Sequence, residues 1–291
     1  MAVSAQLAAF LDEHGGLGQV TVAYSGGLDS CVLLHLAHRW ALARGRSLAA
    51  IHVHHGLNAE ADGWAEHCQQ QAALLGVPLQ LVRVQVKRQP RQSPEDAARQ
   101  ARYQAFAEHV ASGVLLLAHH LNDQAETLLL RMGRGTGPKG LAGMAASRPL
   151  RPDLQLLRPL LGVARPQLEA LAAVAGWLHI DDGSNADPRF RRNALRHQLL
   201  PLWVQLQPGI VAQLGRLAHH CGELDALAME VAQGDLQHCG DCQQLALPAV
   251  TALSPARRNN LLRYWLGLAG VNAEQQQLHE LWRQMSSAGN D

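Results

Sequence analysis

The sequence predicts an α/β fold with a doubly wound, mainly parallel sheet, followed by a second, smaller domain that is entirely α-helical. Two observations lead to this prediction. Between residues 19 and 177, short apolar runs typical of buried strands alternate with segments of helical periodicity. From residue 199 onward, the pattern is helical and rich in Gln, Ala and Leu. Strands and helices that alternate favour parallel pairing, with ligands bound at the carboxyl ends of the strands.

Short apolar runs mark the expected strands. Four of them occupy residues 19–24, 48–55, 78–86 and 113–120, and a further run, LQLLRPLLG, covers residues 154–162. The first, second and fourth runs lead into the polar motifs SGGLDS, HVHHGL and AHHLNDQAET. These three motifs are therefore expected together at one edge of the sheet.

Helices are expected between and after these strands. Helical patterns cover residues 32–40, 59–76, 94–110, 122–133 and 165–177. The third of these has a clear start, because Ser93 is a favoured N-cap and Pro94 suits the first helical position. Gly76 is expected to close the second.

The length and composition predict two domains and a cytoplasmic protein. The 291 residues divide near Pro208-Gly209, which predicts a catalytic domain over 1–208 and a helical domain over 209–291. The sequence has no apolar run long enough for a membrane span, and its first residues lack the basic start of a signal peptide. Five cysteines form no obvious disulfide framework, which fits a reducing compartment.

The glycine motif after the first run predicts an anion-binding loop. A glycine pair followed by a helix start offers backbone amides and the positive end of the helix dipole, here at Ser25, Gly26, Gly27, Leu28 and Ser30. The Walker and Rossmann spacings are both absent. Asp29 would repel a phosphate unless a cation lay between them, and Mg²⁺ is the cation expected there. The alternative is a structural turn in which Asp29 and Ser30 cap the helix.

Basic residues form local patches although the formal net charge is only +1. Between residues 131 and 165 there are seven cations and one acid, and a second arginine cluster follows at 189–196. We expect contacts to RNA phosphates from Arg131, Arg134, Lys139, Arg191, Arg192 and Arg196. Such residues are also common in solvated loops.

The glycine motif resembles the pyrophosphate loop of the N-type ATP pyrophosphatases, an adenine nucleotide α-hydrolase-like group. Within that group, the chain is similar to the tRNA(Ile)-lysidine synthetase family. The blocks HVHHGL, ARYQAF, AHHLNDQAETLLLRMGRGTGPKGLAGM, RPLLG and DDGSNADPRFRRNALRHQLLP carry the resemblance in the same order. The resemblance implies a ligase that uses ATP and Mg²⁺ to adenylate the wobble cytidine of tRNA(Ile) with a CAU anticodon. Free L-lysine then displaces AMP to form lysidine.

The resemblance gives expected roles to further residues. Asp123 and Glu126 lie three apart on one helix face and would hold the lysine ammonium group. Arg99 and Arg102 would pair with the lysine carboxylate or the ATP phosphates. His120 is the candidate for a phosphate or base contact, and His54 and His55 would line the ATP site, although each of the 16 histidines alone has a plain structural alternative.

Two departures and two rival functions remain open at this point. Asn122 stands where many family members have an acid, which puts a metal role for that position in doubt. The chain also ends soon after LHELWRQM, whereas long members continue. One rival is a tRNA thiolation enzyme on the same scaffold, with a metal site around Cys239 and Cys242. The other is a non-catalytic RNA-binding protein with this fold.

Overall fold

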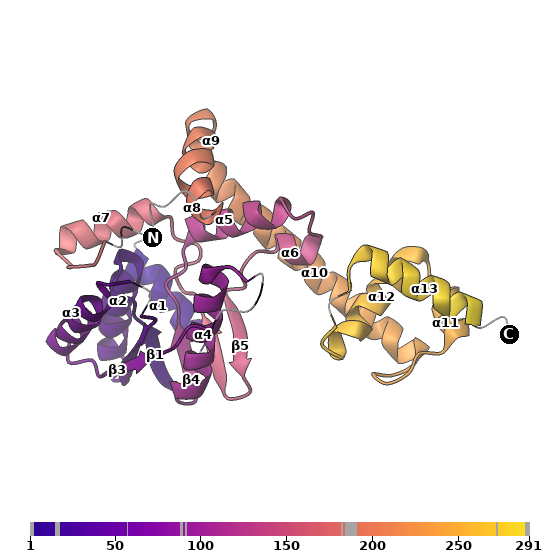
Figure 1. The fold of residues 1–291 in the computed structure, drawn as a ribbon, viewed down its shortest axis with the longest axis horizontal. Helices are drawn as coiled ribbons and strands as arrows, with labels where there is room; N and C mark the ends of the chain where they lie inside the picture. The colour runs from indigo at the N-terminus through magenta and orange to yellow at the C-terminus, as the bar shows by residue number, and fades with distance from the viewer. Residues whose placement is uncertain are drawn as a thin grey trace. The chain divides into compact units, whose positions relative to one another are not determined.

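A computed structural model describes residues 3–14, 18–56, 58–87, 90, 92–181, 183, 191–271 and 273–288 (Figure 1). The chain forms two compact units. The first comprises Met1–Gly135 and Gly143–Arg216, and the second comprises Thr136–Ala142 and Leu217–Asp291. The division at Arg216 falls inside a helix, eight residues beyond Pro208. The assignment of catalysis to one domain and RNA binding to the other stays a prediction.

A six-stranded sheet forms the centre of the first unit. Its strands are β1 (Gln19–Ala23), β2 (Leu48–His54), β3 (Leu79–Arg83), β4 (Gly113–Leu116), β5 (Ser147–Arg151) and β6 (Leu154–Leu157). The order across the sheet is β3-β2-β1-β4-β6-β5, and every neighbouring pair is parallel except the β5–β6 hairpin. The predicted mainly parallel α/β fold is confirmed.

Apolar side chains cover both faces of this sheet. Val114 and Leu116 belong to a buried cluster that also contains residues of the first, second and seventh helices, whereas Leu115 and Leu117 belong to a second cluster with Phe106. Neighbouring residues of a strand point to opposite faces, so the two clusters lie on opposite sides. This explains why β4 reads as an unbroken apolar run.

The helices of the first unit follow the predicted order. They are α1 (Val3–Glu13), α2 (Leu28–Ala43), α3 (Ala61–Leu74), α4 (Pro94–His109), α5 (Leu121–Met132), α7 (Arg165–Ala175), α8 (Arg191–Ala194), the π-helix η2 (Leu195–Leu199) and α9 (Leu200–Leu206). Ser93 caps α4 as predicted, since its hydroxyl accepts from the Asp96 amide at 3.1 Å. Gly76 follows α3 with a φ of +66°, which suits glycine.

The sequence prediction differs from the structure at three strands. The third strand ends at Arg83 and the fourth at Leu116, each shorter than its apolar run. Leu117 belongs to the fourth apolar run but lies in the loop after the strand, where it is buried. Its amide donates a hydrogen bond to the Leu157 carbonyl, but the strand pairing between β4 and β6 does not extend to it. Strand β5 was not predicted, since SRPLR has little strand character and contains a proline. It lies at the sheet edge, where a missing amide is tolerated.

The second unit is helical, as predicted for the end of the chain. It contains α6 (Pro138–Leu141), most of α10 (Ile210–Cys239), α11 (Leu247–Ala252), α12 (Pro255–Leu268) and α13 (Gln275–Ala288). Cys239, Val250 and Leu261 form its buried cluster. Asp235 is 1% exposed and pairs with Arg257. Among the described helices, none has the length and apolar character needed to cross a membrane.

Candidate active site

The glycine loop, residues 25–30, follows β1, includes the first residues of α2 and packs against the segment that contains Ile180. Gly26 has a φ of +89°, and a Cβ placed on it would come within 2.5 Å of the Ile180 side chain and 2.9 Å of the Cys68 sulfur. The Ile180 amide donates a 2.9 Å hydrogen bond to the Gly26 carbonyl. Only glycine satisfies both the backbone angle and the space at this position.

Serine hydroxyls brace the loop from within. Ser30 Oγ donates to the Gly27 carbonyl at 2.9 Å, accepts from the Ser25 amide at 3.2 Å and lies 3.0 Å from Ser25 Oγ. Gly27 is the N-cap of α2, so neither Asp29 nor Ser30 occupies the capping position. The first amides of α2, beginning at Leu28, thus lack a side-chain acceptor from the N-cap residue. This arrangement suits an anion better than a capped structural turn.

His120 connects the glycine loop to α5. Its Nε2 atom lies 3.5 Å from Asp29 Oδ2 and 3.5 Å from Asp123 Oδ2. His120 is also the N-cap of α5: its Nδ1 accepts from the Asp123 amide at 3.3 Å, and the Asp123 carboxylate accepts from the His120 amide at 3.1 Å. An accepting Nδ1 leaves the proton of a neutral ring on Nε2, directed between the two carboxylates.

Asp29 combines a low pKa with an unsatisfied oxygen. Burial acts to raise the pKa of Asp29, but the hydrogen bond and charge of His120, with the charges of Arg165 and Arg196, outweigh burial and lower it. Its Oδ1 is buried and has no hydrogen-bond partner among the described residues. An ionised carboxylate with a free, buried oxygen is a suitable ligand for a cation.

Asp123 and Glu126 share one face of α5, as predicted, and both are paired with arginines. Glu126 accepts from Arg192 Nε and Arg196 Nε, each at 2.6 Å, and from Arg196 Nη2 at 3.0 Å. Asp123 Oδ1 accepts from Arg192 at 3.0 Å and Arg196 at 3.3 Å. We expected these arginines to contact RNA phosphates and these carboxylates to hold the lysine ammonium group, and both roles stay predictions. The structure brings all four groups together, because buried carboxylates need a cation nearby.

The three histidines at the end of β2 have different surroundings. His52 is buried, and its Nδ1 bonds to the Tyr24 carbonyl at 2.9 Å. His54 Nε2 lies 3.2 Å from Asp62, so its ring faces α3. His55 has an unpartnered Nδ1 among the described residues, and burial lowers its pKa to about 4. His55 is therefore the better suited of the two predicted ATP-site histidines, since its ring is neutral and has a free nitrogen.

The other predicted arginines and lysine lie in several places. Arg99 donates to the Tyr103 hydroxyl at 3.2 Å, and Arg131 donates to the Gly143 carbonyl at 2.7 Å. Arg102 is half-buried on α4, and burial followed by the charge of Arg99 lowers its pKa. Exposed positions are occupied by Arg134, Lys139 and Arg191. Arg189, which belongs to the arginine cluster noted in the sequence, lies outside the described residues.

Sequence reasoning missed the contacts that fix the first turn of α5. Asn122 Oδ1 accepts from the Arg165 amide at 3.0 Å, which gives this residue a structural role at the position where many family members have an acid. Gln124 makes two hydrogen bonds to the backbone of Met144, at 3.1 and 2.7 Å. The partners are 20 and 43 residues away in the chain. Local periodicity contains no signal for such distant pairs.

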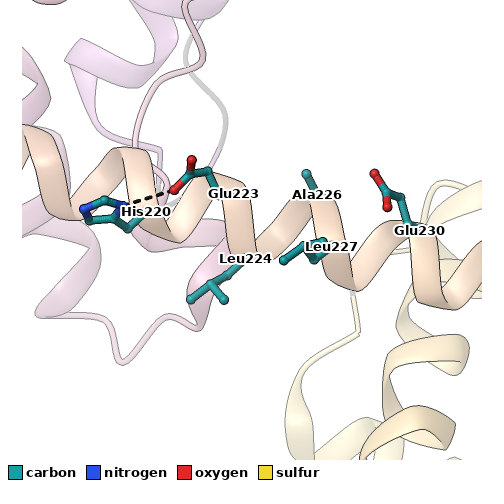
Figure 2. A pocket seen from close by; sticks show the side chains of 6 residues that line it. All are labelled: His220, Glu223, Leu224, Ala226, Leu227 and Glu230. Atoms are coloured by element: carbon teal, nitrogen blue, oxygen red, sulfur yellow. Dashed lines mark hydrogen bonds and ion pairs between the residues drawn. The ribbon is translucent and has the colours of Figure 1, made fainter.

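A hollow on α10 contains none of the predicted site residues. It is lined by His220, Glu223, Leu224, Ala226, Leu227 and Glu230, all on one helix (Figure 2). His220 and Glu223 bond to each other at 3.1 Å. This open surface has no converging reactive groups.

The described residues contain no cluster of three or more His, Cys, Asp or Glu side chains that could hold a metal ion. Cys239 is buried, which raises the pKa of its thiol, whereas Cys242 is exposed. Cys239 and Cys242 are therefore not part of such a cluster among the described residues.

Comparison with known proteins identifies the family. A family model described as a PP-loop domain matches residues 1–203. The chain belongs to the PP-loop family. A second model, described as the TilS substrate binding domain, matches residues 245–291 of this PP-loop chain.

Individual relatives extend this similarity. The chain is 48% identical to tRNA(Ile)-lysidine synthase of Alkalilimnicola ehrlichii over 91% of this chain and 60% of that protein. It is 49% identical to the Pseudomonas aeruginosa protein of the same name, over 84% of this chain and 58% of the relative. The chain thus spans about three fifths of the length of these relatives. The U34-tRNA thiolase NcsA of Methanococcus maripaludis has the same fold, with a TM-score of 0.62, 16% identity and coverage of 75% and 77% of the two chains.

Proposed function

We propose that this chain is a ligase that joins free L-lysine to the wobble cytidine of tRNA(Ile), using ATP. The name of the relatives supports this function, because they are tRNA(Ile)-lysidine synthases of substantial identity. The observation that carries the proposal is the position of His120 Nε2, 3.5 Å from a carboxylate of the glycine loop and 3.5 Å from a carboxylate of the acidic pair. A nucleotide site and an amine site would therefore be neighbours.

The proposed reaction has two steps. The C2 oxygen of cytidine attacks the α-phosphate of ATP, so that a C2–O–AMP bond forms and pyrophosphate leaves. The ε-amine of lysine then attacks C2, forming a C–N bond, and AMP leaves with the former C2 oxygen. The exocyclic oxygen on C2 of cytosine is a poor leaving group, and adenylation of that oxygen makes C2 open to attack by an amine.

The glycine loop would hold the phosphates of ATP. The amides at the start of α2 would bind phosphate oxygens, together with the hydroxyl of Ser25, which is exposed. The free buried oxygen of Asp29 fits Mg²⁺, which usually takes few protein carboxylates and shares its other ligands with substrate phosphates. When bound, Mg²⁺ would neutralise charge that develops at the α-phosphate.

Asp123 and Glu126 would receive the lysine ammonium group by exchange with an arginine. The charges of two carboxylates and two guanidinium groups cancel in the absence of substrate. The lysine ammonium group must therefore displace one of the contacts made by Arg192 or Arg196. Arg196 lies on a π-helix, an element that is rare and frequent at functional sites. Arg102, half-buried on α4 and subject to the charge of Arg192, is the candidate for the lysine carboxylate.

The RNA partner is proposed to be tRNA(Ile) with a CAU anticodon. Exposed cations at Arg134, Lys139 and Arg191 would contact its phosphates, while the helical unit, which contains the match to the TilS substrate binding domain, would add affinity. Phosphate contacts position RNA and do not read its sequence. All three reactants are cytoplasmic molecules, which supports a cytoplasmic location.

Incubation with tRNA, ATP and lysine tests the proposal. Mass spectrometry of nucleosides from the digested tRNA should show one cytidine that has gained lysine with loss of water, and only in the CAU transcript. A transcript with the anticodon GAU serves as the control. Sulfur incorporated in place of lysine would support the thiolation alternative, and unmodified tRNA in all mixtures would support a non-catalytic role.

A further inference from the structure

Four arginines surround Tyr103 and His119 beside the site described above. Arg99 and Arg148 lie over the Tyr103 ring, with their guanidinium carbons 4.9 and 5.2 Å from its centroid. Arg158 donates to His119 Nδ1 at 3.3 Å and to the Ala145 carbonyl at 2.6 Å. We call Arg99, Arg102, Arg148 and Arg158, which come from α4, β5 and the end of β6, the arginine cluster.

Among the described residues, the arginine cluster lacks a matching negative charge. None of its members forms an ion pair with a carboxylate in the part of the chain that the structure describes. The charge of Glu95 acts on Arg102 as the smallest of the influences on its pKa. Arg158 is 3% exposed, and the partners named above are a neutral ring nitrogen and a carbonyl. By contrast, Arg192 and Arg196 each form ion pairs with carboxylates.

Nearby titratable groups respond to this excess of positive charge. Burial acts to raise the pKa of Tyr103, but the charges of Arg99 and Arg158 outweigh it and lower the pKa. Burial and the charge of Arg158 lower the pKa of His119 well below its usual value, so the ring stays neutral and can accept from Arg158. Buried cations held together by neutral acceptors form a site prepared for an anion.

The position of the cluster separates it from the glycine loop. Tyr103 lies on α4, whose Phe106 packs in the cluster of apolar residues on one face of the sheet, whereas α2 packs on the opposite face (Figure 1). His119 and His120 are consecutive, but their rings have different partners: His119 bonds to Arg158, and His120 lies beside Asp29. The anion bound here is therefore distinct from the ATP phosphates.

We propose that Arg99 and Arg148, held over the Tyr103 ring and backed by the buried Arg158, bind backbone phosphates of the RNA strand next to the reacting nucleotide. This inference rests on the proposed function, which makes RNA a substrate. Lysine would bring a single carboxylate, whereas an RNA strand brings successive phosphates to several guanidinium groups. The Tyr103 ring is already in contact with two guanidinium groups, so its role is to hold arginines and not to stack on a base.

Binding of tRNA over a salt series, measured by fluorescence anisotropy without ATP or lysine, tests the inference. Arg148→Gln should weaken binding about three- to tenfold near 0.1 M salt and reduce the log-log slope by roughly 0.7–0.9, the value for one phosphate contact. Tyr103→Phe, which removes the bond to Arg99, should give a smaller loss of the same kind. Arg39→Gln, an exposed position on α2, is the matched control and should match the wild type.

Three outcomes would overturn the inference. The Arg148→Gln slope and affinity could equal those of the control, which would exclude a phosphate contact. The variant could instead weaken ATP binding alone, or raise the lysine requirement alone, which would assign the site to those ligands. RNA binding is measured without chemistry. A protein that makes no lysidine, but whose Arg148→Gln variant loses tRNA affinity, would therefore refute the proposed function and leave the phosphate contact standing.

Discussion

Replacing Glu126 with glutamine should impair the lysine step and leave ATP use intact. The carboxylate is 1% exposed and accepts three hydrogen bonds, at 2.6, 2.6 and 3.0 Å, from Arg192 and Arg196. The amide removes the charge and leaves two guanidinium groups facing Asp123 alone. A neutral amide also cannot balance the ammonium group of lysine. Losing a charge-assisted hydrogen bond of about 1.5–3 kcal/mol should raise the KM for lysine roughly 10- to 100-fold.

The same substitution should measurably destabilise the first unit. Breaking a buried ion pair costs about 3–5 kcal/mol. The arginine side chains are 21% exposed, and the amide oxygen of glutamine can still accept one hydrogen bond. We therefore expect the free energy of unfolding to fall by about 2 kcal/mol. For a unit of this size, that corresponds to a fall in Tm of about 4–8 °C.

Steady-state kinetics with each substrate varied in turn, together with thermal unfolding, would measure both effects. Glu66→Gln, an exposed position on α3, is the control for loss of a carboxylate and should change neither quantity. Equal increases in KM for ATP and lysine would refute the reasoning, because they would assign Glu126 to the nucleotide or to a metal.

Three further predictions concern the glycine loop and its surroundings. Asp29→Asn should nearly abolish tRNA-dependent AMP formation, measured by chromatography, while circular dichroism shows an intact fold; near-normal turnover would remove Asp29 from the metal site. Gly26→Ala should abolish ATP binding in calorimetry, because its Cβ would clash with Ile180. The control Gly45→Ala has no atom within 4 Å of its new Cβ and should lose only about 1 kcal/mol of stability. Lowering the pH from 7 to 5 should destabilise the native protein by roughly 2 kcal/mol through His55 alone. The His55 ring takes up a proton near pH 6.5 in the unfolded chain, but only near its pKa of about 4 in the native protein. His55→Gln should remove that part of the urea-unfolding pH dependence, and an unchanged dependence would contradict the buried neutral ring.

The sequence predicted the parts of the molecule that depend on local pattern. Strand–helix alternation placed SGGLDS and AHHLNDQAET at one sheet edge, and the structure brings Asp29 within 3.5 Å of His120. Spacing of three residues predicted that Asp123 and Glu126 share a helix face, and both bind the same arginines. These features follow from helical and strand periods and from the rule that ligands bind at the carboxyl ends of parallel strands.

The contacts between distant segments could not be predicted in the same way. Arg192 and Arg196 carry the same charge as their neighbours in the sequence, and nothing in RFRRNALRH distinguishes an arginine that pairs with Glu126 from one that faces solvent. The separation of 66 to 73 residues is set by tertiary packing. Strand β5 was missed for a related reason, since its stability comes from pairing with β6 and not from its own composition.

The account requires that adenylation depends on the glycine loop and that lysine transfer depends on the acidic pair. The most direct test follows [α-³²P]ATP and the CAU transcript without lysine, then adds lysine. We predict that labelled AMP accumulates on the wild-type tRNA and is released when lysine is added. Asp29→Asn should form no labelled tRNA, whereas Glu126→Gln should form it and release it slowly. Label that never appears on tRNA, or that leaves it at the same rate with and without lysine, would contradict the account.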